Sequence, residues 1–210
     1  MYSKLQYISQ GETANEQIGN IQLALDAGCN WIQLRFKNAT EEELFDVAEK
    51  VKVLCQKHEA TFIINDNIEL TKDIDADGVH LGLTDESPIV ARNILGQGKI
   101  IGGTANTIQD VLKRAEEKCD YIGLGPFRFT STKKQLSPIL GIEGYISILT
   151  ELKNKNIHIP IYAIGGVVVE DIHPLIKTGI YGIAVSGIIT NHSDKKILIE
   201  QLNTQLHATT

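Results

Sequence analysis

The sequence has few cysteines, and none of them stands in a paired motif. Among its 210 residues are three cysteines, Cys29, Cys55 and Cys119, and no CxxC pattern occurs. Small secreted domains held by disulfides and cysteine-based zinc sites both need closely or regularly spaced cysteines. The sequence therefore excludes these two classes, and we expect a cytoplasmic protein.

Positive charge is also scarce. The chain has 20 Lys and Arg residues against 26 Asp and Glu residues, a formal net charge of -6. Proteins that bind nucleic acid need basic surfaces that neutralise many phosphates. We therefore expect no nucleic-acid partner, and any phosphate group that the chain binds must be recognised by a few local residues.

Long apolar segments and a dinucleotide-binding glycine motif are missing as well. No apolar run approaches the roughly 20 residues that span a bilayer. The N-terminus, MYSKLQYISQGE, lacks the basic and then apolar pattern of a secretion signal. No GxGxxG follows the first apolar run, where a doubly wound dinucleotide-binding sheet would carry it. We therefore expect a protein with no membrane partner and no dinucleotide site.

What the sequence does contain is a regular alternation of short apolar runs and longer segments of helical periodicity. One such segment, residues 41–58, follows a plausible N-cap at Thr40 and is typical of an amphipathic helix. The apolar runs are rich in Ile and Val, as in parallel strands buried on both faces. They cover residues 5–9, 31–36, 61–65, 78–81, 99–105, 121–125, 159–165 and 182–187. This pattern predicts one α/β domain over residues 1–210, a (β/α)8 TIM barrel, with an open doubly wound sheet as its main competitor.

Polar side chains follow several predicted strands, at the end where a TIM barrel carries its active site. On the second strand Gln33, Arg35 and Lys37 alternate with Leu34 and Phe36, so that the three polar side chains share one side. Alone, the two cations could be ordinary solvated charges. Their coincidence with polar loops after other strands, including Thr104 after the fifth, favours a binding site.

Two aspartates follow neighbouring strands. Asp66 comes after the third strand and Asp85 after the fourth. Carboxylates at adjacent strand ends could share a hard cation, and Mg²⁺ is the natural candidate. The alternatives are a helix N-cap at Asp66 and a turn residue before Pro88 at Asp85. We expect His80 to be a packed strand residue, because no second histidine accompanies it at a spacing that suits a metal.

Three loops have the composition of a phosphate site. AIGGV at 163–167 and AVSG at 184–187 follow the seventh and eighth strands, where TIM barrels commonly bind phosphate through backbone N–H groups. Their glycines could instead only form tight turns. After the sixth strand, GPFRFTSTKK at 125–134 adds the hydroxyls of Thr130, Ser131 and Thr132 and the charge of Lys133.

Taken in order, the motifs QLRFK, IINDN, GVHLGLTD, GPFRFTSTKK, AIGGV and AVSG resemble those of the thiamine phosphate synthase family. The resemblance extends from about Gln33 to Gly187, and TSTK after a glycine-proline strand end is its most specific part. It implies a TIM barrel that joins 4-amino-5-hydroxymethyl-2-methylpyrimidine diphosphate to hydroxyethylthiazole phosphate with the help of Mg²⁺. The products are thiamine monophosphate and pyrophosphate.

The resemblance also implies roles for individual residues. The magnesium ligands would be Asp66 and Asp85. The leaving pyrophosphate would be held by Arg35, Asn65 and Lys133, with Gln33 near the pyrimidine and Lys37 in the same charged cluster. The thiazole phosphate would be bound by Thr130, Thr132, Gly166, Ser186 and Gly187. We expect the catalytic residues to be Arg35, Lys133 and Thr104, the last in a position that the family usually fills with serine.

The chain departs from the family pattern at four positions, and other functions stay open. The departures are Phe36, Leu83, Arg128 and Phe129, none of which removes a proposed metal ligand, phosphate charge or hydroxyl. The alternatives are a thiazole phosphate tautomerase, a non-catalytic barrel that binds thiamine intermediates, and a sugar-phosphate isomerase. A homo-oligomer is compatible with the apolar outer-helix positions.

Overall fold

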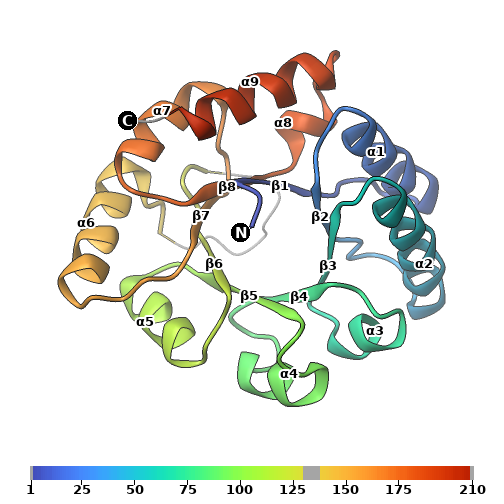
Figure 1. Cartoon of the computed structure of the whole chain (residues 1–210), viewed down its shortest axis with the longest axis horizontal. Coiled ribbons are helices and arrows are strands. Elements are labelled where there is room, and N and C mark those ends of the chain that lie inside the picture. The colour runs from blue at the N-terminus through green and yellow to red at the C-terminus, as the bar shows by residue number, and fades with distance from the viewer. Residues whose placement is uncertain (1, 130–137, 209–210) are drawn as a thin grey trace.

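Parallel strands close into a barrel, and helices surround it (Figure 1). The computed structural model describes residues 2–129 and 138–208. Each strand pairs with its neighbour in sequence, and pairing of Leu5 with Ile183 closes the ring between the first and last strands. The strands are β1 (Leu5–Ile8), β2 (Trp31–Leu34), β3 (Thr61–Asn65), β4 (Gly78–Leu81), β5 (Ile100–Ala105), β6 (Tyr121–Leu124), β7 (Ile161–Ile164) and β8 (Gly182–Val185).

Several helices start at capping boxes that the sequence encodes locally. Thr13, Thr40 and Thr107 each accept a hydrogen bond from the backbone N–H three residues later, and the acidic side chain at that position bonds back to the cap. The helices are α1 (Ala14–Asp26), α2 (Glu41–Lys57), α3 (Ile68–Asp73), α4 (Pro88–Leu95), α5 (Ile108–Glu116), α6 (Gly141–Asn154), the 3₁₀ helix η1 (Val169–Asp171), α7 (Ile172–Lys177), α8 (Gly187–Thr190) and α9 (Lys195–His207).

The TIM barrel predicted from the sequence is confirmed, and the open sheet is not found. All the apolar runs form strands, and the segment after Thr40 forms α2. The predicted strand ends differ slightly: β2 ends at Leu34 and β8 at Val185, each two residues earlier than predicted. The residues beyond these ends leave the ladder and line the pocket described below.

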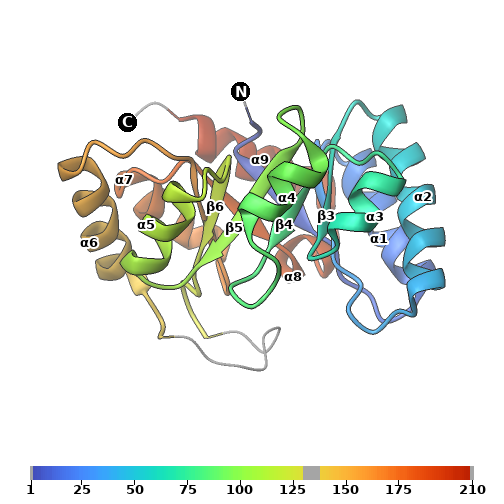
Figure 2. The same ribbon diagram turned by 90° about the horizontal axis from the view of Figure 1, so that it is seen from below.

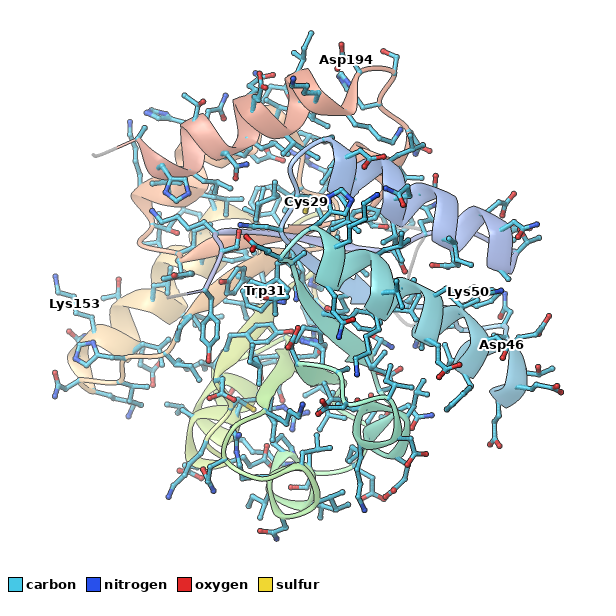
Figure 3. The ribbon with its side chains drawn as sticks, turned by 45° about the vertical axis from the view of Figure 1, so that its right-hand side comes forward. Cys29, Trp31, Asp46, Lys50, Lys153 and Asp194 are labelled. Atoms are coloured by element: carbon cyan, nitrogen blue, oxygen red, sulfur yellow. The ribbon has the colours of Figure 1, made fainter. Side chains whose placement is uncertain are left out.

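Aromatic rings fill the interior of the barrel toward its amino-terminal end. Trp31, Tyr121 and Tyr162 are fully buried, and their ring centroids lie 5.1 to 5.4 Å apart. Figure 3 shows Trp31 in the middle of the molecule, whereas Asp46 projects outward from α2. A Cβ on Gly102 would lie 2.2 Å from the Tyr121 ring, so this position needs glycine for close approach. The rings thus form an aromatic plug, which leaves the carboxyl-terminal half of the barrel open for ligands.

The two ends of the barrel are clearly distinguished. Figure 2 shows α8, which follows β8, on the side opposite to the N-terminus, so the carboxyl ends of the strands face that side. In TIM barrels this face carries the active site. Among the described residues, no helix is both long enough and apolar enough to span a membrane.

Candidate functional site

A cavity of about 730 Å³ opens at the carboxyl ends of the strands. Its size is that of a typical small-molecule site. Residues predicted from the sequence line it from six of the strand ends: Gln33, Arg35, Lys37, Asn65, Asp66, Asp85, Thr104, Gly166, Ser186 and Gly187. The barrel therefore brings together residues that are up to 154 positions apart, from Gln33 to Gly187.

Asp66 and Asp85 lie side by side in this cavity. Burial, a hydrogen bond with Asp85 and the charge of Asp85 together raise the pKa of Asp66 from 3.8 to about 6. Asp66 has a φ of 66°, a left-handed conformation that is strained for residues other than glycine. One oxygen of Asp85 accepts a hydrogen bond from the N–H of Gly82 at 2.6 Å. Two carboxylates this close together, one of them on a strained backbone, form a suitable place for a cation.

The structural alternative is wrong for Asp66 and holds for Asp85. Asn67 caps α3, through a hydrogen bond from the N–H of Leu70, so Asp66 is not the N-cap. Ser87 caps α4, and Asp85 lies in the turn before Pro88, where it accepts a hydrogen bond from the N–H of Gly82. A role for Asp85 as a metal ligand therefore stays a prediction. Within residues 2–129 and 138–208, no group of three or more His, Cys, Asp or Glu side chains could hold a metal. Two carboxylates fit Mg²⁺, which commonly takes one or two protein carboxylates, waters and phosphate oxygens of the substrate.

Arg35 and Lys37 surround the carboxylate pair with positive charge. Lys37 lies 3.6 Å from a carboxylate oxygen of Asp66. The guanidinium of Arg35 has no hydrogen bond or ion pair among the described residues, and burial lowers its pKa while the charge of Asp66 raises it. Its backbone is held firmly: Ser9 accepts from its N–H at 2.8 Å, and Gln17 donates to its carbonyl at 3.2 Å. A half-buried cation on a fixed backbone, with no partner among the described side chains, is suited to bind an anion.

Gln33 offers a buried acceptor to the cavity. Its side-chain nitrogen donates to Asn65 at 2.8 Å. Its oxygen Oε1 is buried and has no hydrogen-bond partner among the described residues, although the side chain is only 2% exposed. Because a buried acceptor without a partner is costly, this atom is suited to a ligand that donates a hydrogen bond.

Thr104 ends a chain of hydrogen bonds that starts at the far side of the barrel. Gln6 donates to the Tyr121 hydroxyl at 3.2 Å, and this hydroxyl lies 3.0 Å from Nδ1 of His80. Nε2 of His80 lies 3.0 Å from the Thr104 hydroxyl. In the arrangement consistent with the Gln6 donor, Tyr121 donates to His80 and His80 donates to Thr104. The proton of the Thr104 hydroxyl is then directed away from His80.

The opposite side of the cavity is made of backbone. Gly165 and Gly166 have φ values of 84° and 75°, which only glycine adopts readily. Among the residues described, the N–H groups of Gly166 and Gly187 have no acceptor. Ser186 is 3.4 Å from the side chain of Gln10, which reaches over from the β1–α1 loop. Backbone N–H groups that have no acceptor within the protein are suited to bind an oxyanion.

A bidentate ion pair supports this glycine cradle, by which we mean residues 165–167 and 186–187. Arg128 places two nitrogens 2.8 Å from the two oxygens of Asp171, and one of them also donates to the carbonyl of Gly166 at 3.1 Å. Asp171 additionally accepts from the N–H of Val168 at 2.9 Å. The ion pair joins the segment after β6 to the loop after β7.

Comparison with known proteins agrees with this geometry. The family model described as thiamine monophosphate synthase matches residues 5–189. The chain belongs to this family. It is 60% identical to the thiamine-phosphate synthase of Flavobacterium johnsoniae, over 99% of this chain and 98% of the relative. Its identity to the corresponding protein of Flavobacterium psychrophilum is 59%, over 98% of this chain and 100% of the relative.

A solved structure of the thiamine monophosphate synthase family has the same fold. Thiamine phosphate pyrophosphorylase from Pyrococcus furiosus superposes with a TM-score of 0.84 at 28% identity. The match covers 97% of this chain and 95% of that one. The predicted family resemblance is therefore confirmed over nearly the whole length, including the strands that carry the cavity.

Three of the predicted site residues lie outside the described residues. They are Thr130, Thr132 and Lys133, in the TSTK motif that suggested the family. Their roles remain predictions, as do the roles of the residues that line the cavity.

Sequence reasoning missed three residues that hold the thiamine monophosphate synthase site together. His80 was expected only to pack, yet it lines the cavity and bonds to Thr104. Gln17, on α1, lines the cavity and fastens the backbone of Arg35. Arg114, on α5, contacts the strand ends behind the cavity. The only sequence signal was a polar residue within an otherwise apolar or helical pattern.

Proposed function

We propose that this chain is a thiamine-phosphate synthase, a transferase that joins 4-amino-5-hydroxymethyl-2-methylpyrimidine diphosphate to hydroxyethylthiazole phosphate. The products are thiamine monophosphate and pyrophosphate. The observation that carries the proposal is the presence, in one cavity, of the Asp66–Asp85 pair, the half-buried cation of Arg35 and the glycine cradle. One ligand with a diphosphate and another with a single phosphate account for all three.

The charged side of the cavity fits the diphosphate. Asp66 and Asp85 would hold Mg²⁺, which supplies electrostatic stabilisation to the departing pyrophosphate when it is bound. Arg35 and Lys37 add positive charge on the protein's side, and preorganised charge of this kind lowers the barrier for an anionic leaving group. We propose a dissociative substitution, in which the bond to pyrophosphate breaks first and the aminopyrimidine ring delocalises the positive charge on its methylene carbon.

The remaining groups orient the two reactants. Gln33 Oε1, a buried acceptor with no partner among the described residues, would accept from the amino group of the pyrimidine. The N–H groups of Gly166 and Gly187 would bind the phosphate of the thiazole, a role supported by the lack of a described acceptor for either group. The thiazole nitrogen then attacks the methylene carbon, and the cavity keeps water away from the cation.

Nothing in this reaction requires a protein nucleophile, and the cysteines support this view. Burial raises the pKa of Cys29 to about 11 and that of Cys55 and Cys119 to about 12. Thiols with such pKa values are poor nucleophiles near neutral pH. None of the three lines the cavity.

The alternatives explain less of the cavity. A thiazole phosphate tautomerase or a sugar-phosphate isomerase would use the glycine cradle but needs no metal-bound diphosphate, so the aspartate pair and Arg35 would have no task. A non-catalytic barrel could bind the same ligands without converting them. Only an assay of turnover separates this last possibility from the synthase.

The test is release of pyrophosphate by the purified protein, supplied with both substrates, with and without Mg²⁺, while thiamine phosphate is followed by mass spectrometry. The synthase requires both substrates and the metal and forms the two products in equal amounts. Folded protein that binds thiazole phosphate but forms no thiamine phosphate would overturn the proposal in favour of the tautomerase or the non-catalytic barrel.

A further inference from the structure

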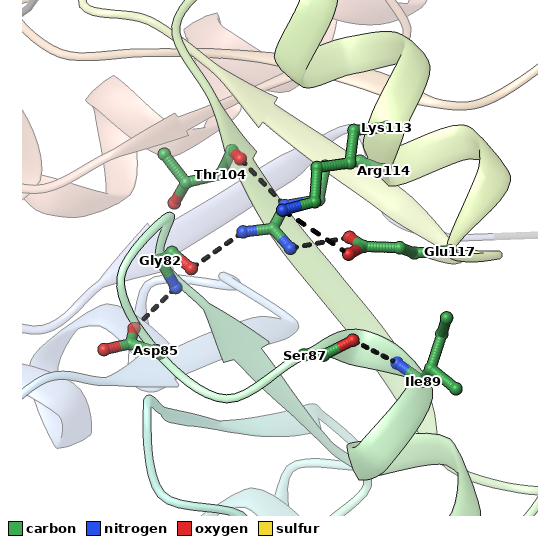
Figure 4. A network of polar contacts seen from close by, with 8 residues as sticks. All are labelled: Gly82, Asp85, Ser87, Ile89, Thr104, Lys113, Arg114 and Glu117. Carbon is green, nitrogen blue, oxygen red and sulfur yellow. Dashed lines mark hydrogen bonds and ion pairs between the residues drawn. The ribbon is translucent and has the colours of Figure 1, made fainter.

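Arg114 is a buried arginine behind the cavity and does not touch it. It lies on α5, is 3% exposed, and reaches the strand ends from outside the barrel (Figure 4). Its Nη2 donates to the carbonyl of Gly82 at 2.7 Å, its Nε to the carbonyl of Thr104 at 3.1 Å, and its Nη1 to Glu117 at 2.8 Å. One side chain thus bridges the ends of β4 and β5.

Each nitrogen of this buried guanidinium has an acceptor. A buried charge is costly unless it is neutralised and hydrogen-bonded. Glu117, itself only 11% exposed in its side chain, supplies the opposite charge, and the two carbonyls take the other donors. The neighbouring Lys113, in contrast, keeps 66% of its side chain exposed, as a surface cation does. Arg114 is therefore part of a built polar cluster.

Gly82 transmits the position of Arg114 to the carboxylate pair. The carbonyl of Gly82 is held by Arg114, and its N–H is held by one oxygen of Asp85 at 2.6 Å (Figure 4). The carboxyl group of Asp85 also interacts with Asp66. A shift of the Gly82 peptide would consequently move Asp85 relative to Asp66.

Thr104 is held in the same way from two sides. Arg114 fixes its carbonyl, and His80 contacts its hydroxyl. Thr104 and Asp85 come from neighbouring strand ends, and Arg114 is the side chain that contacts the backbone at both. The spacing between the carboxylate pair and the Thr104 hydroxyl therefore depends on a planar group with several donors in fixed directions.

The backbone makes room for this arginine. A Cβ on Gly103 would lie 2.8 Å from Cδ and 3.0 Å from Nε of Arg114, and 2.9 Å from Sγ of Cys119, so Gly103 makes room for both side chains. Because the φ of Gly103 is not positive, its backbone conformation does not require glycine. Glycine is needed here because a larger residue would not fit. The position that Arg114 takes therefore requires glycine at residue 103.

We propose that Arg114 is a positioning residue that sets the place of Asp85 and Thr104 for the Mg²⁺-bound diphosphate, an inference that rests on the proposed function. Loss of the planar group weakens the use of Mg²⁺ and the diphosphate and leaves the glycine cradle as it is. Supporting groups of this kind commonly change metal affinity or activity by about 10- to 100-fold.

Arg92 provides a matched control at the other end of the barrel. It donates to the carbonyls of Gly96 and Lys99 at 3.3 and 2.6 Å and pairs with Asp120 at 2.6 Å. It therefore has the same set of acceptors, two carbonyls and one carboxylate. Lys99 and Asp120 precede β5 and β6, on the side away from the cavity.

The experiment compares Arg114→Lys with Arg92→Lys, each first shown to be folded by its thermal unfolding midpoint. Both changes keep the charge and remove the planar group. The Mg²⁺ concentration for half-maximal synthesis and the KM for each substrate are measured, and Mg²⁺-dependent binding of pyrophosphate is measured separately by titration calorimetry. Gly103→Ala, which displaces Arg114 without removing it, is a second variant that covers failure of the first to fold.

We expect Arg114→Lys and Gly103→Ala to raise the Mg²⁺ requirement and weaken Mg²⁺–pyrophosphate binding by about 10-fold or more, with the KM for thiazole phosphate nearly unchanged. Arg92→Lys should change unfolding only. An Arg114 variant that behaves like the Arg92 variant, while the parent protein turns over, would overturn this inference alone. A parent protein that neither forms thiamine phosphate nor binds Mg²⁺–pyrophosphate would overturn the proposed function and this inference with it.

Discussion

On the β2–β5 side the cavity is lined by charged and polar side chains, whereas on the β7–β8 side it is lined by the backbone of glycines. The charged side is supported by buried side-chain contacts, such as those of Arg114. The glycine side is supported by backbone conformation and by the more exposed Arg128, whose side chain is 49% exposed. Substitutions on the two sides should therefore reduce activity for different reasons. On the first side they remove charge, and on the second they change the shape of the backbone.

Removal of one carboxylate should have the largest effect. Asp66→Asn should lower kcat/KM by about 100- to 1,000-fold, because a metal ion contributes several kcal/mol to stabilising a departing anion. Pyrophosphate release over a range of Mg²⁺ concentrations measures this. Asp75→Asn is the control, since Asp75 pairs with Lys99 at 2.5 Å and does not line the cavity. Equal activity of both variants would contradict the assignment of the charged side.

A methyl group in the glycine cradle should have a smaller and different effect. In Gly166→Ala the new Cβ would meet Arg128 and Phe129 at 3.0 Å, at a φ of 75°. This strain should raise the KM for thiazole phosphate about 5- to 30-fold and leave the Mg²⁺ requirement unchanged. Gly28→Ala is the matched control, because Gly28 has a φ of 96° with open space around it. A change in the Mg²⁺ requirement instead of KM would erase the distinction between the two sides.

Loss of the Arg128–Asp171 ion pair should matter less. Arg128→Gln should raise the KM for thiazole phosphate only about two- to fivefold, because partly exposed ion pairs contribute about 0.2–1 kcal/mol. The difference between variant and parent should shrink at high salt. Lys155→Gln, which removes a 3.8 Å ion pair on the surface of α6, is the control and should leave KM unaltered. An effect as large as that of Gly166→Ala would mean that side chains also govern the glycine side.

The smallest effect should be a gain in folding stability when one charge of the Asp66–Asp85 pair is removed. Burial and the neighbouring Asp85 raise the pKa of Asp66 from 3.8 to about 6, so the folded protein keeps this proton to higher pH than the unfolded chain does. Stability contributed by Asp66 is therefore lost as pH rises from about 4 to about 6 and stays lost above that range.

In the absence of Mg²⁺, Asp66→Asn should stabilise the fold at pH 8 by about 1 kcal/mol, a modest figure because the side chain is 35% exposed. Thermal unfolding at pH 4.5 and pH 8 measures it, with an expected rise of about 2–4 °C at the higher pH only. Destabilisation at pH 8 would show that the pair does not repel.

The fold could be predicted because its determinants are local. Each β strand is a short apolar run, and the caps at Thr13, Thr40 and Thr107 lie three residues from their partners. The placement of polar residues at one mouth then follows from the topology of the barrel, which puts all strand ends on one face. Arg35, Asp66 and the other cavity residues that follow strands were therefore predictable from the sequence as neighbours.

The supporting contacts could not be predicted, because they depend on register between distant segments. Gln6 and Tyr121 are 115 residues apart and meet inside the barrel. In the sequence, Arg114 and Lys113 are two adjacent cations on an amphipathic helix and cannot be told apart. The packing of α5 buries the side chain of Arg114 and leaves that of Lys113 exposed. The N-cap of α3 is Asn67 and not Asp66, one residue earlier. Sequence patterns do not locate the end of a helix to within a single residue.

The aromatic plug contains the chain's only tryptophan, which gives the protein an intrinsic fluorescent probe. Trp31 is the single tryptophan of the chain, and its indole N–H has no hydrogen-bond partner among the described residues. Its ring packs on Tyr121, which is bonded to His80, which in turn contacts Thr104 at the cavity. All tryptophan fluorescence therefore comes from one buried site that is connected to Thr104, at the cavity, through Tyr121 and His80. We expect ligand binding in the cavity to change this emission, so that occupancy at one end of the barrel is measurable at the other without an attached dye.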